Sequence, residues 1–112
     1  MAISKDVELH EVADVDNGTD FEKKHFPDLC FKDGKFFVEV GKRLEHPQTE
    51  EHLIDEINLF VNDELVAEKT LSATDDQKAE FEVSVKAGDK VYALENCNLH
   101  GAWKSNIVEV EA

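Results

Sequence analysis

Residues 91–103 read VYALENCNLHGAW: an apolar run that predicts a strand leads directly into a loop carrying Cys97 and His100. A separation of three positions lets one loop aim a sulfur and an imidazole at the same point, which is a spacing found among metal ligands. On its own the pair is weak evidence, because a Cys-x-x-His sequence also arises by chance and a buried cysteine is often inert packing. The interpretation therefore depends on the other histidines of the chain.

Two further short segments hold three of the other four histidines. Residues 22–27, EKKHFP, contain His25, and residues 46–52, HPQTEEH, begin and end with a histidine. Two side chains six residues apart fall on different faces of a helix, so 46–52 is predicted to be a loop.

Together the three segments offer four imidazoles and one thiolate, from His25, His46, His52, His100 and Cys97. This is one donor more than the four protein ligands of a closed structural zinc site. Iron, zinc and copper all accept such donors, but five protein ligands leave one open octahedral position, which favours iron and substrate chemistry. A blue-copper site usually adds an axial methionine, and the only methionine is Met1. Zinc stays an alternative for protein isolated from a foreign host.

Composition predicts a small acidic domain. With 112 residues, 41% of them apolar, residues 1–112 are expected to form one domain around one modest core. The net charge of -14 argues against nucleic acid or an anionic membrane as a partner. No apolar run approaches the roughly 20 residues of a membrane span, and the N-terminus lacks the apolar stretch of a secretory signal. A cytoplasmic location is therefore expected.

The positive charges lie close to the candidate ligands in the sequence. Five basic residues fall within four positions of one of these histidines or of Cys97: Lys23, Lys24, Lys42, Arg43 and Lys104. This clustering points to an anionic substrate.

Alternation of apolar and polar residues predicts an all-β chain. Short strands are expected at 30–31, 36–40, 57–61, 65–67, 81–85, 91–94 and 107–110. About seven strands with turn signals between them, such as Asp33-Gly34 and Asn62-Asp63, favour an antiparallel β-sandwich.

The segments outside these strands are expected to be irregular. Residues 1–20 are polar and unpatterned, so they predict an ordered but irregular lead-in. Pro27 biases Phe26 away from helix, and His25 is expected to lie in extended or looped backbone.

In this order, residues 22–27, 40–52 and 91–103 resemble the one-iron superoxide reductases, also called neelaredoxins. The similarity extends from about Phe21 to Val110. It implies an immunoglobulin-like sandwich around one mononuclear non-haem iron, with the four histidines as equatorial ligands and Cys97 as the axial ligand. The related desulfoferrodoxins carry a further four-cysteine iron site, but no cysteine precedes Cys30, so a single iron is expected.

The resemblance also implies a reaction, the one-electron reduction of superoxide to hydrogen peroxide in defence against oxidative stress. By similarity Lys24, immediately before the first histidine, attracts the anion. Many relatives carry a glutamate two positions before that histidine as the resting sixth ligand, but Lys23 stands there. Glu22 is therefore a candidate sixth ligand. The alternatives are a non-catalytic iron-binding or sensing module and an electron-transfer protein.

The remaining expectations concern partners and neighbours of the site. A rubredoxin-like electron donor is implied by the resemblance, and a homo-oligomer is left open. The backbone N–H groups of Asn98 and Leu99 are expected to tune the sulfur by hydrogen bonding. Trp103 is expected to pack beside the site, Cys30 to be a buried strand residue and His10 to be exposed.

Overall fold

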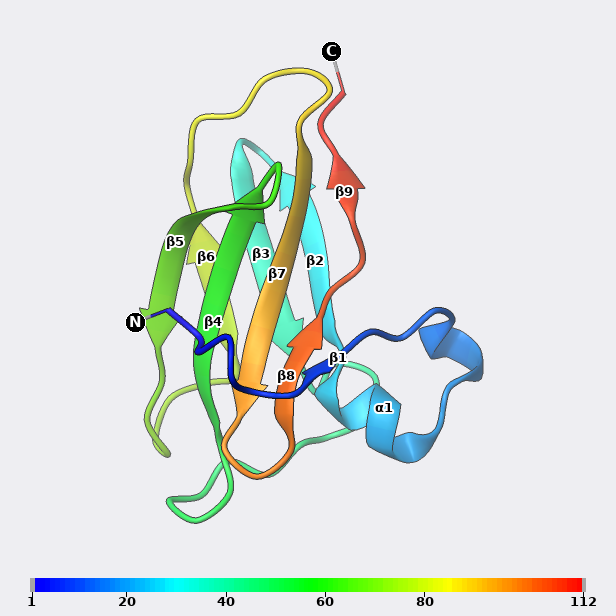
Figure 1. The fold of residues 1–112 in the computed structure, drawn as a ribbon, viewed down its shortest axis with the longest axis vertical. Helices are drawn as coiled ribbons and strands as arrows, with labels where there is room; N and C mark the ends of the chain where they lie inside the picture. Colours follow the sequence, from blue (N-terminus) through cyan, green and yellow to red (C-terminus); the bar gives the residue numbers. More distant parts are fainter. Residues whose placement is uncertain (1, 112) are drawn as a thin grey trace.

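The computed structural model describes residues 2–111 and shows a β-sandwich with a short α-helix beside its lower end (Figure 1). Its elements are, in chain order, β1 (Leu9–His10), η1 (Val15–Asn17), α1 (Asp20–His25), β2 (Pro27–Lys32), β3 (Lys35–Val40), β4 (Ile54–Val61), β5 (Glu64–Thr70), β6 (Lys78–Phe81), β7 (Lys90–Cys97), β8 (Gly101–Lys104) and β9 (Val108–Glu109). Within the described range, no helix has the length and apolar character needed to span a membrane. The predicted all-β, immunoglobulin-like sandwich is confirmed.

Two sheets form the layers of the sandwich. The larger sheet has six strands in the order β1-β8-β7-β4-β5, with β9 paired to β7, and the smaller sheet has the order β2-β3-β6. Residues 2–111 thus form nine strands. Of these, β1 and β8 were not predicted, and the strand expected at 107–110 is the two-residue β9. The pairing departs from the expected antiparallel order at β1, which runs parallel to β8.

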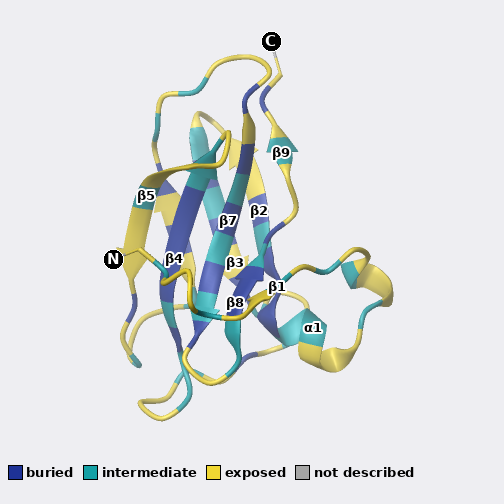
Figure 2. Cartoon of the chain, in the orientation of Figure 1, coloured by how far each residue is buried: buried dark blue, intermediate teal, exposed yellow. Residues whose placement is uncertain are grey.

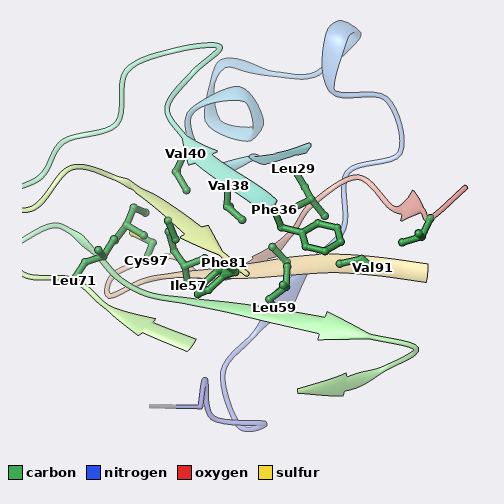
Figure 3. Close-up of a cluster of buried hydrophobic side chains, with 14 residues drawn as sticks. Leu29, Phe36, Val38, Val40, Ile57, Leu59, Leu71, Phe81, Val91 and Cys97 are labelled. Atoms are coloured by element: carbon green, nitrogen blue, oxygen red, sulfur yellow. The ribbon is translucent and has the colours of Figure 1, made fainter. Parts of the chain in front are cut away.

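The core lies between the two sheets and comes from alternate residues of their central strands. Ile57 and Leu59 of β4 and Val91 of β7 are fully buried, and Phe36 of β3 packs with them from the other sheet (Figure 3). Figure 2 shows the buried stretches along β4 and β7. Because side chains alternate along a strand, the same register turns Cys97 inward at the lower end of β7, where it is 1% exposed.

Two tight hairpin turns lie where the sequence predicts them. Asp33 and Gly34 join β2 to β3 with φ values of 53° and 79°. Asn62 and Asp63 join β4 to β5 with φ values of 50° and 67°. Two consecutive residues with positive φ match the twist of antiparallel strands, and Asn, Asp and Gly adopt this conformation at the lowest cost.

Two of the strand predictions were wrong in detail. The strand expected at 81–85 ends at Phe81, the last residue of β6. Residues 82–86 join neither sheet, although Val83 and Val85 pack against the core. Cys30 is exposed rather than buried. β2 turns Leu29 toward the core, so the alternation of side chains places Cys30 on the outer face of the sheet.

The lead-in is more regular than expected, and it contains β1, η1 and the start of α1. Thr19 Oγ1 accepts a hydrogen bond from the Glu22 N–H at 3.1 Å, and Glu22 Oε1 accepts one from the Thr19 N–H at 2.9 Å. This capping box starts α1, so His25 ends a helix and does not lie in extended backbone. The restriction by Pro27 acts only on Phe26, whose φ and ψ are -67° and 121°.

Gly101→Ala is expected to destabilise the fold more than Gly88→Ala. The two glycines have φ values of 83° and 91°, so alanine at either position costs about 1–2 kcal/mol in backbone strain. A Cβ at Gly101 would also lie 2.5 Å from the Glu8 carbonyl oxygen, whereas a Cβ at Gly88 meets nothing within 4 Å. Urea unfolding of the metal-free proteins measures both losses. Equal losses would contradict the close approach of β1 to β8.

Candidate metal centre

The predicted ligands converge at the lower end of the sandwich, where α1 and two loops meet (Figure 1). His25 ends α1, His46 and His52 lie in the connection between β3 and β4, and Cys97 ends β7. The candidate ligand atoms of these four residues all lie within 4.8 Å of one another. The fold therefore brings four of the five predicted ligands into one group.

His100 joins the group from the turn between β7 and β8 and does so through its Nδ1 atom. Nδ1 lies 3.7 Å from the Sγ atom of Cys97 and 3.2 Å from Nε2 of His25. The ring of His100 packs edge-on against the ring of His52, with 5.1 Å between centroids. All five predicted donors therefore lie close together at this end of the sandwich.

Backbone carbonyls fix which nitrogen of two of the histidines faces this position. Nδ1 of His25 donates a hydrogen bond to the Phe21 carbonyl at 2.7 Å. Nδ1 of His46 donates one to the Pro47 carbonyl at 2.6 Å. A neutral imidazole that donates through Nδ1 keeps its lone pair on Nε2. Nε2 of His46 accordingly lies 3.6 Å from the Cys97 sulfur.

A buried nitrogen without a partner shows that the site fits a cation. Nε2 of His52 is buried and has no hydrogen-bond partner among the described residues. Leaving such an atom unpaired costs about 1–3 kcal/mol, and coordination to a metal ion would satisfy its lone pair. Four imidazoles and one thiolate are donors that iron, zinc and copper accept. The residues present therefore fit a metal ion, iron included.

Burial keeps the imidazoles in the neutral form that binds metals. Desolvation is the largest cause that lowers the pKa of His25 and the pKa of His52. Desolvation likewise lowers the pKa of His46 to about 4, and the neighbouring imidazole of His25 adds to this effect. The three side chains are therefore uncharged at physiological pH.

The backbone N–H groups of Leu99 and His100 lie against the Cys97 sulfur. The sequence had predicted Leu99 together with Asn98. Burial raises the pKa of the Cys97 thiol, whereas hydrogen bonds from the N–H groups of Leu99 and His100 lower it. A bound metal cation would remove the thiol proton outright. The Asn98 N–H donates instead to the Leu53 carbonyl at 3.1 Å. The Asn98 side chain accepts a hydrogen bond from the Leu53 N–H at 2.9 Å, so this residue positions the loop and does not tune the sulfur.

Gln48 and Gln77 hold the loop that begins at His46, a role that sequence reasoning missed. Nε2 of Gln77 lies 3.0 Å from the His46 carbonyl, 2.8 Å from the Pro47 carbonyl and 2.9 Å from Oε1 of Gln48. Oε1 of Gln48 also accepts a hydrogen bond from the Ile54 N–H at 2.9 Å. No local pattern signals these contacts, because a glutamine in a polar loop looks the same whether or not it bridges two loops.

Gln77→Glu is expected to weaken metal binding by about 10- to 100-fold, the loss typical of partners that orient a ligand. The new carboxylate would face three oxygen atoms, none of which can donate a hydrogen bond to it. Gln77→Leu removes the donor without adding a charge, so its loss of affinity should be smaller. Titration against a chelator measures both. An affinity of Gln77→Glu equal to that of the native protein would contradict this positioning role.

Glu22 has a role different from the one considered for it. Its carboxylate closes the capping box with Thr19, and it is not part of the group of ligand atoms. The reason is geometric, because a glutamate in the first turn of a helix reaches back toward the cap, whereas His25 lies at the other end of α1. The signal for this was present in the sequence as the Thr-x-x-Glu pattern of residues 19–22.

Lys24 and the other basic residues differ in their partners. Lys24 is half-buried in the last turn of α1, and its ammonium forms no ion pair within residues 2–111. Arg43 pairs with Asp16 and with Asp28, and Lys104 pairs with a glutamate of the lead-in. Of the five basic residues expected to attract an anion, only the lysines of α1 and of the β3–β4 connection have no ion-pair partner within residues 2–111.

A buried carboxyl group lies two residues before the sulfur on β7. Glu95 is fully buried, and neither of its oxygens has a hydrogen-bond partner among the described residues. Burial raises the pKa of Glu95 well above its usual range, and the charge of Asp55 adds to this effect. Trp103 lies opposite Glu95 in the register of β7 and β8, and it packs against His25 as predicted.

Comparison with known proteins points to one family. The desulfoferrodoxin family model matches residues 17–106. The chain is 37% identical over 99 residues to a desulfoferrodoxin homolog of Archaeoglobus fulgidus, covering 88% of this chain and 73% of that protein. It is also 37% identical over 98 residues to a putative superoxide reductase of Methanocaldococcus jannaschii, covering 78% of this chain and 83% of that protein.

A solved structure shows the same fold. The one-iron superoxide reductase from Giardia intestinalis matches with a TM-score of 0.68 and 27% sequence identity, over 79% of this chain and 99% of that chain. The segment that matches the family model contains all five candidate ligands. This chain belongs to the desulfoferrodoxin family.

Proposed function

We propose that this chain is a superoxide reductase, which reduces superoxide to hydrogen peroxide at a mononuclear non-haem iron site. The observation that carries the proposal is the convergence of four imidazoles and one thiolate from separate segments on one position. A closed structural zinc site has four protein ligands and no need of a fifth. Membership of the family, and the superoxide reductases among the relatives, support the same function.

The side chains of His25, His46, His52, His100 and Cys97 would hold the iron. Iron(II) bound there would supply the one electron that superoxide gains, and two protons from solvent would complete hydrogen peroxide. Four neutral imidazoles and one thiolate contribute a single negative charge, so the loaded ferrous site stays positive and attracts a small anion. The N–H groups of Leu99 and His100 stabilise the charge on the sulfur.

The chain leaves one side of the site accessible. His25 is 2% exposed and His46 is 3% exposed, whereas His52 and His100 are half-buried. The Cys97 side chain belongs to the hydrophobic core cluster. Superoxide therefore approaches from the side away from the core, past the loops that carry His52 and His100.

Pulse radiolysis of the iron-loaded ferrous protein tests the proposal. A pulse of superoxide is expected to oxidise the site with a second-order rate constant on the order of 10⁸ to 10⁹ M⁻¹s⁻¹, close to the diffusional ceiling. Hydrogen peroxide should form without oxygen, and a visible ferric-thiolate band should remain. A slow reaction with iron correctly bound would favour the alternative, a non-catalytic iron-binding, sensing or electron-transfer module.

Two further predictions extend this proposal. A rubredoxin-like protein donates the electron that restores iron(II), and the chain works in the cytoplasm. The oligomeric state, a monomer or a homo-oligomer, is left open. Reduction by candidate carriers and cell fractionation would test the two predictions in turn, and light scattering would decide the oligomeric state.

A further inference from the structure

Three aromatic rings form a continuous stack from β1 to the metal centre. The ring of His10 lies on the indole of Trp103, with centroids 4.1 Å apart and planes 14° apart. The indole lies in turn on the ring of His25, with centroids 4.8 Å apart and planes 19° apart. His25 is a candidate ligand, so the stack ends at the metal position.

The outer end of the stack reaches the surface, and the inner end does not. The side chain of His10 is 27% exposed, so it is partly covered and not exposed as the sequence predicted. Trp103 and His25 are each 2% exposed. The parallel pairing of β1 with β8 sets His10 opposite Trp103 in register. The short strand in the lead-in therefore holds a surface imidazole over the only tryptophan of the chain.

Trp103 contributes its ring and not its N–H group. Its Nε1 atom is buried and has no hydrogen-bond partner among residues 2–111, which costs about 1–3 kcal/mol. Phenylalanine would fill much of the same space without that cost, so burial of apolar area does not by itself account for tryptophan. A role in electron transfer does account for it, because the rate of electron transfer falls steeply with the distance between donor and acceptor. The large indole ring of Trp103 fills the space between the rings of His10 and His25 and so keeps that distance short.

We propose that the stack of His10, Trp103 and His25 is the route by which an electron from a protein one-electron carrier reaches the metal centre. This rests on the proposed function, since the reaction with superoxide leaves iron(III), which must regain an electron. The carrier loses one electron and iron(III) becomes iron(II), and no proton, group or bond moves along the rings.

The test measures the two half-reactions of the iron-loaded protein separately. His10→Leu is expected to slow reduction of the ferric protein by reduced rubredoxin about tenfold, equivalent to about 1.4 kcal/mol in activation free energy. Reaction of the ferrous protein with superoxide, and reduction of the ferric protein by ascorbate, should keep their native rates. His10→Phe restores a ring and should recover most of the lost rate.

Phe21→Leu is the matched control. Phe21 is a second exposed ring in contact with His25, Trp103 and His100, but it meets the latter two edge-on instead of stacking. Because its ring does not stack on Trp103, its replacement should slow reduction by rubredoxin less than His10→Leu does. Slower reduction in Phe21→Leu combined with a native rate in His10→Leu would overturn the proposed route and place electron transfer at the open side of the site.

A second readout needs no metal. Because Trp103 is the only tryptophan, the fluorescence of the metal-free protein reports on the stack. His10→Leu is expected to change the emission and His10→Phe to return it toward the native spectrum. A changed emission with a native rate of reduction would overturn the route. If the native ferrous protein fails to react with superoxide, the proposed function is wrong. The rates at which rubredoxin reduces the ferric native protein and the ferric His10→Leu variant still test the proposed electron route.

Discussion

Cys97→Ser is expected to remove the visible thiolate band of the ferric protein and to slow its ferrous reaction with superoxide by about 100-fold or more. Loss of a residue that merely orients a ligand already costs about 10- to 100-fold, and Cys97 is a candidate ligand itself. Its sulfur lies 3.6 Å from Nε2 of His46 and 3.7 Å from Nδ1 of His100. Serine at this position keeps its proton far more readily than a thiol does and offers a harder, weaker donor.

The matched control for this prediction is Cys30→Ser. Cys30 is exposed on the outer face of β2, so its replacement should alter neither the spectrum nor the reaction. Iron content, the absorption spectrum of the oxidised protein and pulse radiolysis are measured on both variants. Retention of the visible band in Cys97→Ser would show that Cys97 does not bind the metal.

Lys24→Ala is expected to slow the second-order reaction with superoxide about tenfold at low ionic strength, the lower end of the effect of electrostatic steering. The chain has a net charge of -14, which by itself repels the anion. Salt screens charges beyond about 8 Å under physiological conditions, so distant carboxylates matter less than an ammonium at the site. Lys24 immediately precedes His25 and lacks an ion-pair partner in the described part of the chain.

Two variants separate local steering from net charge. Lys24→Arg keeps the charge and should keep most of the rate. Lys32→Ala removes one positive charge at the upper end of β2 (Figure 1), far from the site, and should leave the rate nearly native. The difference between Lys24→Ala and the native protein should shrink as salt is added. Iron content should stay unchanged, and a native rate for Lys24→Ala at low salt would remove this lysine from the mechanism.

The sequence predicted those features that depend on neighbours along the chain. The turn at Asp33 and Gly34 needs only residues that tolerate positive φ, and β4 and β7 need only alternation of apolar residues. The capping box of Thr19 and Glu22 is equally local, and it extends the helix to His25, two residues before Pro27. The conformational restriction by Pro27 reaches only the preceding residue, Phe26, so it does not keep His25 out of the helix.

The sequence by itself determined the class of fold, two of its hairpin turns, and the five candidate metal ligands, because each follows from residue type and short-range spacing. Only the tertiary structure decided how those side chains are used. His100 offers Nδ1 because its turn folds against His25, and Gln77 reaches the His46 loop from another strand connection. His10 stacks on Trp103 because β1 pairs with β8. These contacts join residues far apart in the chain, so they depend on the register and closure of the whole sandwich.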